Sequence, residues 1–220
     1  MSRGLGDVYK RQGNVKGMNF MFGGCKLLES LVFDENFDTS NVTNMRYMFS
    51  GCYALHTLDV SKFNTSYVTN MEGMFSACTA LSELDLSNFD THKVTLMNNM
   101  FYNYGPYSIL KKIKLGENFT TEKATNLSEM FSFCNALEKI EYALGEEFKF
   151  TTAEGTNLTN LRRMFNGCKN LTSVDLSGLN TEKVTNMREM FTDCQKLDND
   201  DFNSLQFKSA SGVELMDVSG

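Results

Sequence analysis

The chain has 220 residues, of which 41% are hydrophobic and 22% charged, which is typical of a folded protein of one domain or one medium repeat array. Its formal net charge of -6 argues against nucleic acid or an anionic membrane as the partner, because both require a basic surface. No apolar run approaches the roughly 20 residues that a membrane-spanning helix needs.

Residues 1–12 read MSRGLGDVYKRQ and have no counterpart in the rest of the chain. The segment from Ser2 to Gln12 resembles the in-frame translation of a transposon-based sequencing adaptor, so we predict that 1–12 is an artefact and not native sequence. It also lacks the apolar segment of a secretory signal. Because a DNA cut at Gly13 would remove any native leader, this lack is not evidence for a cytoplasmic protein.

An eleven-residue motif, V-T-N-M-x-x-M-F-x-x-C, recurs through the remaining chain and is clearest at residues 68–78. Its copies begin at Val15, Val42, Val68, Val94, Ala124, Leu158 and Val184. The intervals are 27, 26, 26, 30, 34 and 26 residues, and such a period with a leucine pattern is typical of a leucine-rich-repeat solenoid.

A second block, L-x-x-L-x-L-x-x-F, follows the motif and is clearest at residues 81–89. The alternation at 84–86 predicts a short half-buried strand that pairs in parallel with its copies. Residues 71–75 have apolar side chains at i, i+3 and i+4, which predicts one turn of α-helix or 3-10 helix. The predicted fold is therefore an α/β repeat, a right-handed solenoid with short parallel strands on one face and short helical or 3-10 segments on the other.

Two copies depart from the pattern. The fourth copy has Tyr104 in place of the cysteine and continues into an insertion with Pro106, where we expect a turn. The fifth copy continues through a longer polar segment, 141–155, which we expect to bulge from the regular coil. The pattern fades after Cys194, so we predict a solenoid of seven coils over 13–202 and a divergent coil, a cap or a truncated continuation over 203–220.

Together, the two blocks resemble the BspA-like leucine-rich repeats of bacterial and mycoplasmal surface proteins. The copies at 42–65, 68–91 and 158–181 carry the resemblance most clearly, and it covers about residues 14–197. Members of that family are typically secreted or anchored at the cell surface, and some adhere to host matrix proteins or to other microbes. The resemblance therefore implies an extracellular or cell-surface protein, and it supplies no catalytic residue to carry over.

The six cysteines end the motif in every copy but the fourth: Cys25, Cys52, Cys78, Cys134, Cys168 and Cys194. No pair has the C-x-x-C spacing of a zinc site, so we expect no metal and predict buried free thiols that pack as small apolar side chains. The alternative is a disulfide between adjacent coils, such as Cys52–Cys78, since the spacing of coils lies within the Cα range for a disulfide.

Methionine, asparagine and threonine form further columns. We expect methionine at the fourth and seventh motif positions to pack in the core, because Leu127 and Leu161 replace it in two copies and leucine cannot bind a metal. Buried turns leave backbone groups that need partners, and we expect the polar columns to supply them. These columns are Asn44, Asn70, Asn126, Asn160 and Asn186, and Thr39, Thr65, Thr91, Thr121 and Thr181.

The outward-facing strand positions are the best candidates for binding a partner protein. One row is Thr57, Glu83, Lys112, Lys139 and Ser173, and the other is Asp59, Asp85, Lys114, Glu141 and Asp175. We expect Lys114, between Asp85 and Glu141, to relieve the repulsion of these like charges. The alternative is an ordinary solvated sheet face.

No catalytic motif is present: the sequence has no G-x-S-x-G, no H-E-x-x-H and no Gly-rich phosphate loop. We therefore expect no enzyme, no cofactor and no calcium loop. The predicted function is a protein–protein interaction module, with adhesion to host or microbial surface proteins. The alternatives are a structural spacer that projects another domain, and a non-catalytic appendage of a secreted hydrolase.

Overall fold

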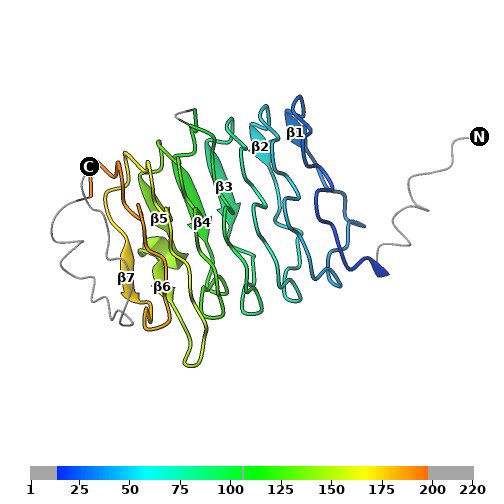
Figure 1. The fold of residues 1–220 in the computed structure, drawn as a ribbon. Helices are drawn as coiled ribbons and strands as arrows, with labels where there is room; N and C mark the ends of the chain where they lie inside the picture. The colour runs from blue at the N-terminus through cyan, green and yellow to red at the C-terminus, as the bar shows by residue number, and fades with distance from the viewer. Residues whose placement is uncertain (1–13, 106, 198–220) are drawn as a thin grey trace, which may run out of the picture.

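The computed structural model describes residues 14–105 and 107–197 (Figure 1). The described chain forms a row of coils that follow one another side by side from the N-terminal to the C-terminal end (Figure 1). The strands in chain order are β1 (Ser30–Leu31), β2 (Thr57–Leu58), β3 (Glu83–Leu86), β4 (Lys112–Leu115), β5 (Lys139–Glu141), β6 (Lys149–Thr151) and β7 (Asp175–Gly178).

The strands pair in parallel, as predicted, in three small sheets: β1-β2, β3-β4-β5 and β6-β7. In β3 exposed and buried residues alternate, so Leu84 and Leu86 face the core while Glu83 and Asp85 face solvent. The predicted alternation at 84–86 is therefore confirmed.

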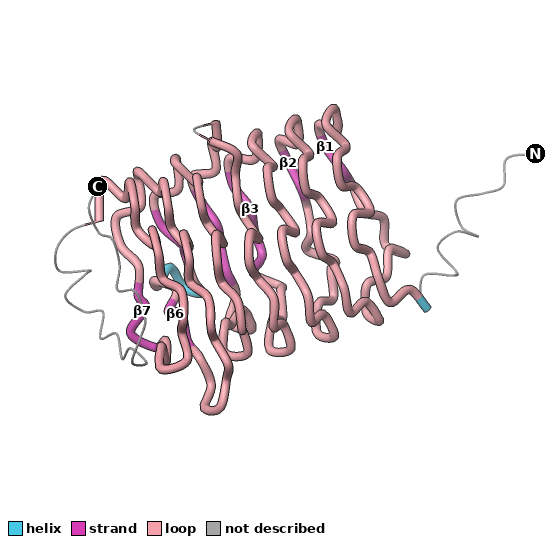
Figure 2. Tube along the Cα trace, in the orientation of Figure 1, coloured by secondary structure: helices cyan, strands magenta, loops and turns pink. Residues whose placement is uncertain are grey.

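The predicted helical segments are wrong. The described residues contain no α-helix, and most of each coil consists of turns (Figure 2). The one 3-10 segment with full bounds, η2 (Ala143–Gly145), lies in the long insertion and not in the repeated motif.

Hydrogen bonds explain why the motif does not form a helix. In residues 71–77 alternate amides leave the coil: Met71 donates to the Leu96 carbonyl and Phe75 to the Met100 carbonyl, each at 2.9 Å. The amides between them stay within the coil, as when Met74 donates to Met71 at 3.2 Å. A helix uses every interior amide within its own segment. Here alternate amides form hydrogen bonds to the next coil instead, so no helix forms.

This arrangement needs left-handed backbone at the sixth motif residue of every copy. Those residues are Phe20, Tyr47, Gly73, Asn99, Glu129, Arg163 and Glu189, with φ between 52° and 59°. Only one of them is glycine, although glycine is the residue that adopts this conformation without a steric penalty. The contacts between stacked coils therefore hold the backbone in a conformation that the local sequence does not favour.

The core is a continuous stack of the motif side chains. From the second coil onward, the methionines at the fourth and seventh motif positions are at most 1% exposed, which confirms their predicted place in the core; in the first described coil Met21 is 47% exposed. The phenylalanine after the second methionine forms a ladder of nearly parallel rings through Phe22, Phe49, Phe75, Phe101, Phe131, Phe165 and Phe191. Adjacent rings in this ladder lie 5.1 to 5.9 Å apart.

The polar columns satisfy the backbone as predicted, in two different ways. The buried Thr65 hydroxyl joins adjacent coils, because it donates to the Asp90 carbonyl at 2.9 Å and accepts from the Asp90 amide at 2.8 Å. Thr39, Thr91 and Thr121 repeat this contact. Each asparagine instead acts within its own coil, as when the Asn70 side chain accepts from the Glu72 amide at 2.9 Å.

The segment 141–155 does more than bulge from the coil. It contains η2 and strand β6, which pairs with β7, and it buries Phe148 and Phe150 in the core. The repeat pattern did not predict this strand, because the segment is rich in polar residues and carries no copy of the motif. Pro106 and residues 198–220, with their predicted turn and divergent C-terminal segment, lie outside the described residues, as do residues 1–13.

Candidate functional site

The two predicted rows of side chains are brought together on strands β3, β4 and β5. The register pairs Glu83 of β3 with Lys112 of β4, which pairs in turn with Lys139 of β5. In the other row it pairs Asp85 with Lys114, and Lys114 with Glu141. These rows therefore lie on three neighbouring strands as the repeat alignment predicts.

Ion pairs cross the strands in both directions from β4. The Lys112 ammonium lies 2.6 Å from one Glu141 oxygen, and Lys139 lies 3.0 Å from the other. Lys114 lies 3.2 Å from Asp85. The expected relief of repulsion by Lys114 is thus correct for Asp85. The charge of Glu141 is instead balanced by Lys112 and Lys139, which belong to the other row. These contacts hold the ammonium groups of all three lysines against carboxylates of the same face.

Three carboxylates on this face, those of Asp59, Asp85 and Glu141, have a pKa below the ordinary value. The hydrogen bond from Lys112, and then that from Lys139, lowers the pKa of Glu141. Burial raises the pKa of Asp85, but hydrogen bonds from Ser87 and Lys114 outweigh it and the net pKa is lowered. The Ser61 side chain lowers the pKa of Asp59 in the same way. The face therefore presents fixed charges of both signs at neutral pH.

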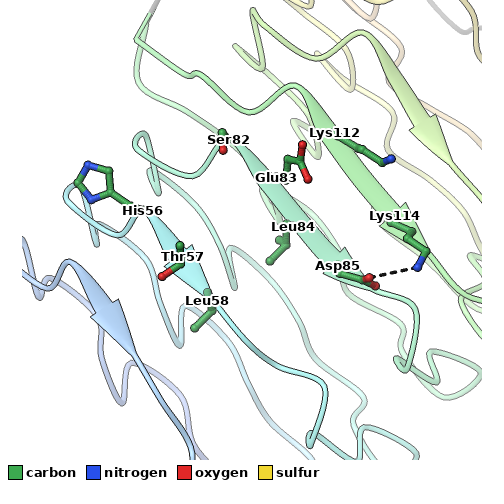
Figure 3. Close-up of a pocket in the computed structure, with 9 residues that line it drawn as sticks. All are labelled: His56, Thr57, Leu58, Ser82, Glu83, Leu84, Asp85, Lys112 and Lys114. Atoms are coloured by element: carbon green, nitrogen blue, oxygen red, sulfur yellow. Dashed lines mark hydrogen bonds and ion pairs between the residues drawn. The ribbon is translucent and has the colours of Figure 1, made fainter.

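A depression of about 490 Å³ lies across β2, β3 and β4 (Figure 3). Its lining residues are His56, Thr57, Leu58, Ser82, Glu83, Leu84, Asp85, Lys112 and Lys114. The Lys112 side chain extends away from Glu83 toward β5, and Glu83 forms no ion pair with any residue in the described part of the chain (Figure 3). Glu83 is thus an exposed carboxylate with no ion pair among the described residues.

The remaining predicted residues lie at the two ends of this face. Thr57 lies in β2, and Asp59 follows it and accepts from the Ser61 amide at 2.9 Å. Ser173 precedes β7, and Asp175 begins it. The predicted row is interrupted there, because Asp175 aligns with Lys149 of β6 and not with Glu141. Strand β6 comes from the insertion, which the repeat alignment could not place.

A second charged surface, on the turns of the motif, was not predicted. Ion pairs join adjacent coils there between Arg46 and Glu72, Glu129 and Arg162, and Arg163 and Glu189. All of these residues occupy the fifth or sixth motif position, which varies between copies. Opposite charges at these positions in neighbouring copies could have predicted the ion pairs.

The cysteines form a row of thiols that hydrogen-bond to the coil before them. Cys78 donates to the Phe49 carbonyl at 3.2 Å, and Cys52, Cys134, Cys168 and Cys194 repeat this contact. All six are free thiols, and burial is as predicted for Cys52, Cys78, Cys134 and Cys168. It is wrong for Cys25, which is exposed in the first described coil, and Cys194 is only half-buried.

Thiol labelling is expected to separate Cys25 from the buried cysteines. Burial raises the pKa of Cys52 to about 11 and that of Cys134 to about 12, so these thiols stay protonated and unreactive at neutral pH. A chromogenic disulfide reagent should modify Cys25 quickly in the native chain. In denaturant without reductant all six should react, and a lower number would indicate a disulfide.

Within the described residues, no three or more His, Cys, Asp or Glu side chains converge to hold a metal ion. No helix there is long and apolar enough to cross a membrane.

Comparison with known families identifies the chain. The family described as "Mycoplasma protein of unknown function, DUF285" matches residues 16–144 and 109–217. The chain belongs to the DUF285 family. No curated protein matches this DUF285 chain.

Two solved structures are similar to this DUF285 chain at low identity. One is a leucine rich cell surface protein from Faecalibacterium prausnitzii A2-165, with 16% identity over 84% of this chain and 78% of that chain and a TM-score of 0.31. The other is a leucine-rich repeat protein from Bacteroides ovatus ATCC 8483, with 14% identity over 78% and 76% and a TM-score of 0.17.

Proposed function

We propose that this DUF285 chain is a non-catalytic protein-binding module of a secreted or cell-surface protein, built as a right-handed leucine-rich-repeat solenoid that adheres to host or microbial surface proteins. The observation that carries the proposal is the strand face of β3, β4 and β5. Its charged side chains are aligned in register, and ion pairs fix the lysines before binding.

Preorganisation is the physical advantage of this face. A partner that binds flexible lysines must pay the entropy of ordering them, whereas here Lys112, Lys114 and Lys139 are already held by carboxylates. The mixed charges favour one orientation of the partner and oppose others, which gives specificity more than affinity. Glu83, which has no ion pair among the described residues, is a point at which a partner's lysine or arginine can bind.

Reversing the charge of the face tests adhesion. The triple variant Asp59→Lys, Asp85→Lys and Asp175→Lys should retain immobilised matrix extract or microbial cells about tenfold less than the parent chain, because like-charge contacts in an interface cost several kcal/mol. Circular dichroism of the variant checks that the chain still folds.

The control carries the same change of net charge elsewhere. Glu35, Glu154 and Glu182 are exposed and lie off the strand face, so their replacement by lysine should leave retention within about twofold if the face and not the overall charge decides binding. Unchanged retention of every partner by the first variant would overturn the strand face as the binding surface.

A spacer role is the second candidate, supported by the unbroken ladder of phenylalanine rings through the described coils. Such a stack resists bending because each coil contacts its neighbours along its whole length. If the parent chain retains neither matrix proteins nor cells, the spacer or the appendage of a secreted hydrolase becomes the better interpretation.

A further inference from the structure

The strand face has a break in its pairing between β2 and β3. In the described part of the chain, β2 pairs with β1 and β3 pairs with β4, and no register joins β2 to β3. On the motif half of the same two coils the bonding continues, since the Met45 amide donates to the Asn70 carbonyl at 3.0 Å. The two coils therefore lose their pairing only along their strands.

The break leaves a backbone amide and a backbone carbonyl without their usual partners. The residue after the first leucine of the second block donates its amide to the carbonyl at the same position in the coil before. His56 donates to Glu29 at 2.9 Å, Lys111 to Ser82 at 2.8 Å and Glu138 to Lys111 at 3.2 Å. Between them in the series, the Ser82 amide and the His56 carbonyl form no hydrogen bond within residues 14–105 and 107–197.

The opening is short, because hydrogen bonds between the two coils close it at both ends. Before the strands, the Thr79 hydroxyl donates to the Tyr53 carbonyl at 3.3 Å. After the strands, the Asn88 side chain donates to the Val60 carbonyl at 3.0 Å. The depression of about 490 Å³ lies across this opening, and the half-buried Leu58 is among its lining residues (Figure 3). The opening is therefore long enough for a side chain and its own peptide groups, and not for a whole added strand.

The charged residues that line the depression leave one carboxylate unpaired. Lys114 pairs with Asp85, and Lys112 pairs with Glu141. Glu83 is exposed and has no ion pair among the described residues. A side chain that complements the opening therefore carries a positive charge for Glu83, further N–H donors for a carbonyl, and an apolar stem.

We infer, building on the proposed function of the strand face, that the opening between β2 and β3 binds an arginine side chain of the partner protein. The guanidinium group has five N–H donors in a planar fork, so it can pair with the Glu83 carboxylate and also donate to the His56 carbonyl. Its methylene stem packs on Leu58. A main-chain carbonyl beside the arginine accepts from the Ser82 amide. Lysine fits less well, because its donors radiate from a single nitrogen.

N-acetylarginine amide tests this inference, since it carries the guanidinium group and both flanking peptide groups. Added to the isotopically labelled full chain, it should shift the amide resonances of Leu58, Ser82 and Glu83 in a saturable way, with a Kd on the order of millimolar for a single exposed ion pair. N-acetylcitrulline amide has nearly the same shape without the charge. It should bind at least about threefold more weakly.

Variants of the protein locate the site. Glu83→Gln keeps the shape of the side chain, removes its charge and should weaken binding of N-acetylarginine amide by at least about threefold. Glu138→Gln is the matched control, because Glu138 is exposed on the strand half where adjacent coils are bonded, and it should change binding by less than about 1.5-fold.

An absence of saturable shifts, equal binding of the citrulline probe, or equal effects of the two variants would overturn the arginine site. The measurement uses no adhesion partner, so the two proposals can fail separately. Retention of matrix proteins without arginine binding would overturn this site alone, whereas arginine binding without retention would support the site and contradict the adhesive function.

Discussion

Replacement of Gly116 by alanine is expected to reduce the free energy of unfolding by about 3 kcal/mol or more, at the upper end of overpacking effects. A Cβ atom at Gly116 would lie 1.8 Å from the Ser87 carbonyl oxygen and 2.6 Å from its carbon. Both atoms belong to the backbone of the adjacent coil, so no side-chain rotation can relieve the clash. The coils that carry β3 and β4 would have to separate where their paired register ends.

Urea denaturation followed by circular dichroism measures this loss as a lower midpoint. Gly17→Ala is the control, since the nearest atom to its added Cβ is the Asn19 side-chain oxygen at 3.1 Å, which can move. The control should shift stability by less than about 1 kcal/mol. Equal losses in the two variants would show that the close approach of Ser87 does not determine the effect.

The need for glycine at 116 could not be predicted from the repeat pattern. Gly116 follows the strand residue Leu115 just as Ser87 follows Leu86 and Ser177 follows Leu176. The alignment therefore suggests that serine would be accepted there. Only the distance between two coils excludes it, and that distance depends on how the strands diverge after their last pair.

The strand register, in contrast, followed directly from the sequence. In a stack of like coils each residue lies beside the residue at the same repeat position, so an alignment of copies is also a list of contacts. This is why the neighbours of Glu83 and Asp85 on β4 and β5 were correctly predicted. The rule failed at Asp175, where the insertion adds β6 without a repeat motif to mark it.

The turn half of the coil was predicted poorly for a different reason. The spacing of Met71, Met74 and Phe75 fits one helical face, and all three are indeed buried. Periodicity reports which side chains face the core but not where the amides bond. Here alternate amides bond to the next coil, and left-handed residues such as Tyr47 and Glu129 follow from that choice. The residue types at these positions do not indicate that alternate amides bond to the next coil.

Removal of the ring of Phe131 tests how far the stack depends on its aromatic ladder. Phe131 is fully buried, with parallel rings of Phe101 at 5.1 Å and Phe165 at 5.4 Å, and Phe150 approaches it edge-on at 6.1 Å. Phe131→Ala should lower the free energy of unfolding by about 3–5 kcal/mol, since it removes a large buried side chain and leaves a cavity.

The cavity would lie where the regular repeat meets the insertion, because Phe101 and Phe165 belong to the motif while Phe150 belongs to β6. Collapse around it would require the two coils or β6 to shift, and each is bonded to its neighbours, so little of the cost can be recovered. Calorimetry should show one transition at lower temperature. Phe20→Ala, at the exposed start of the stack, should change stability by less than about 1 kcal/mol. A similar loss in both variants would mean that ring stacking, and not burial, sets the contribution of each phenylalanine.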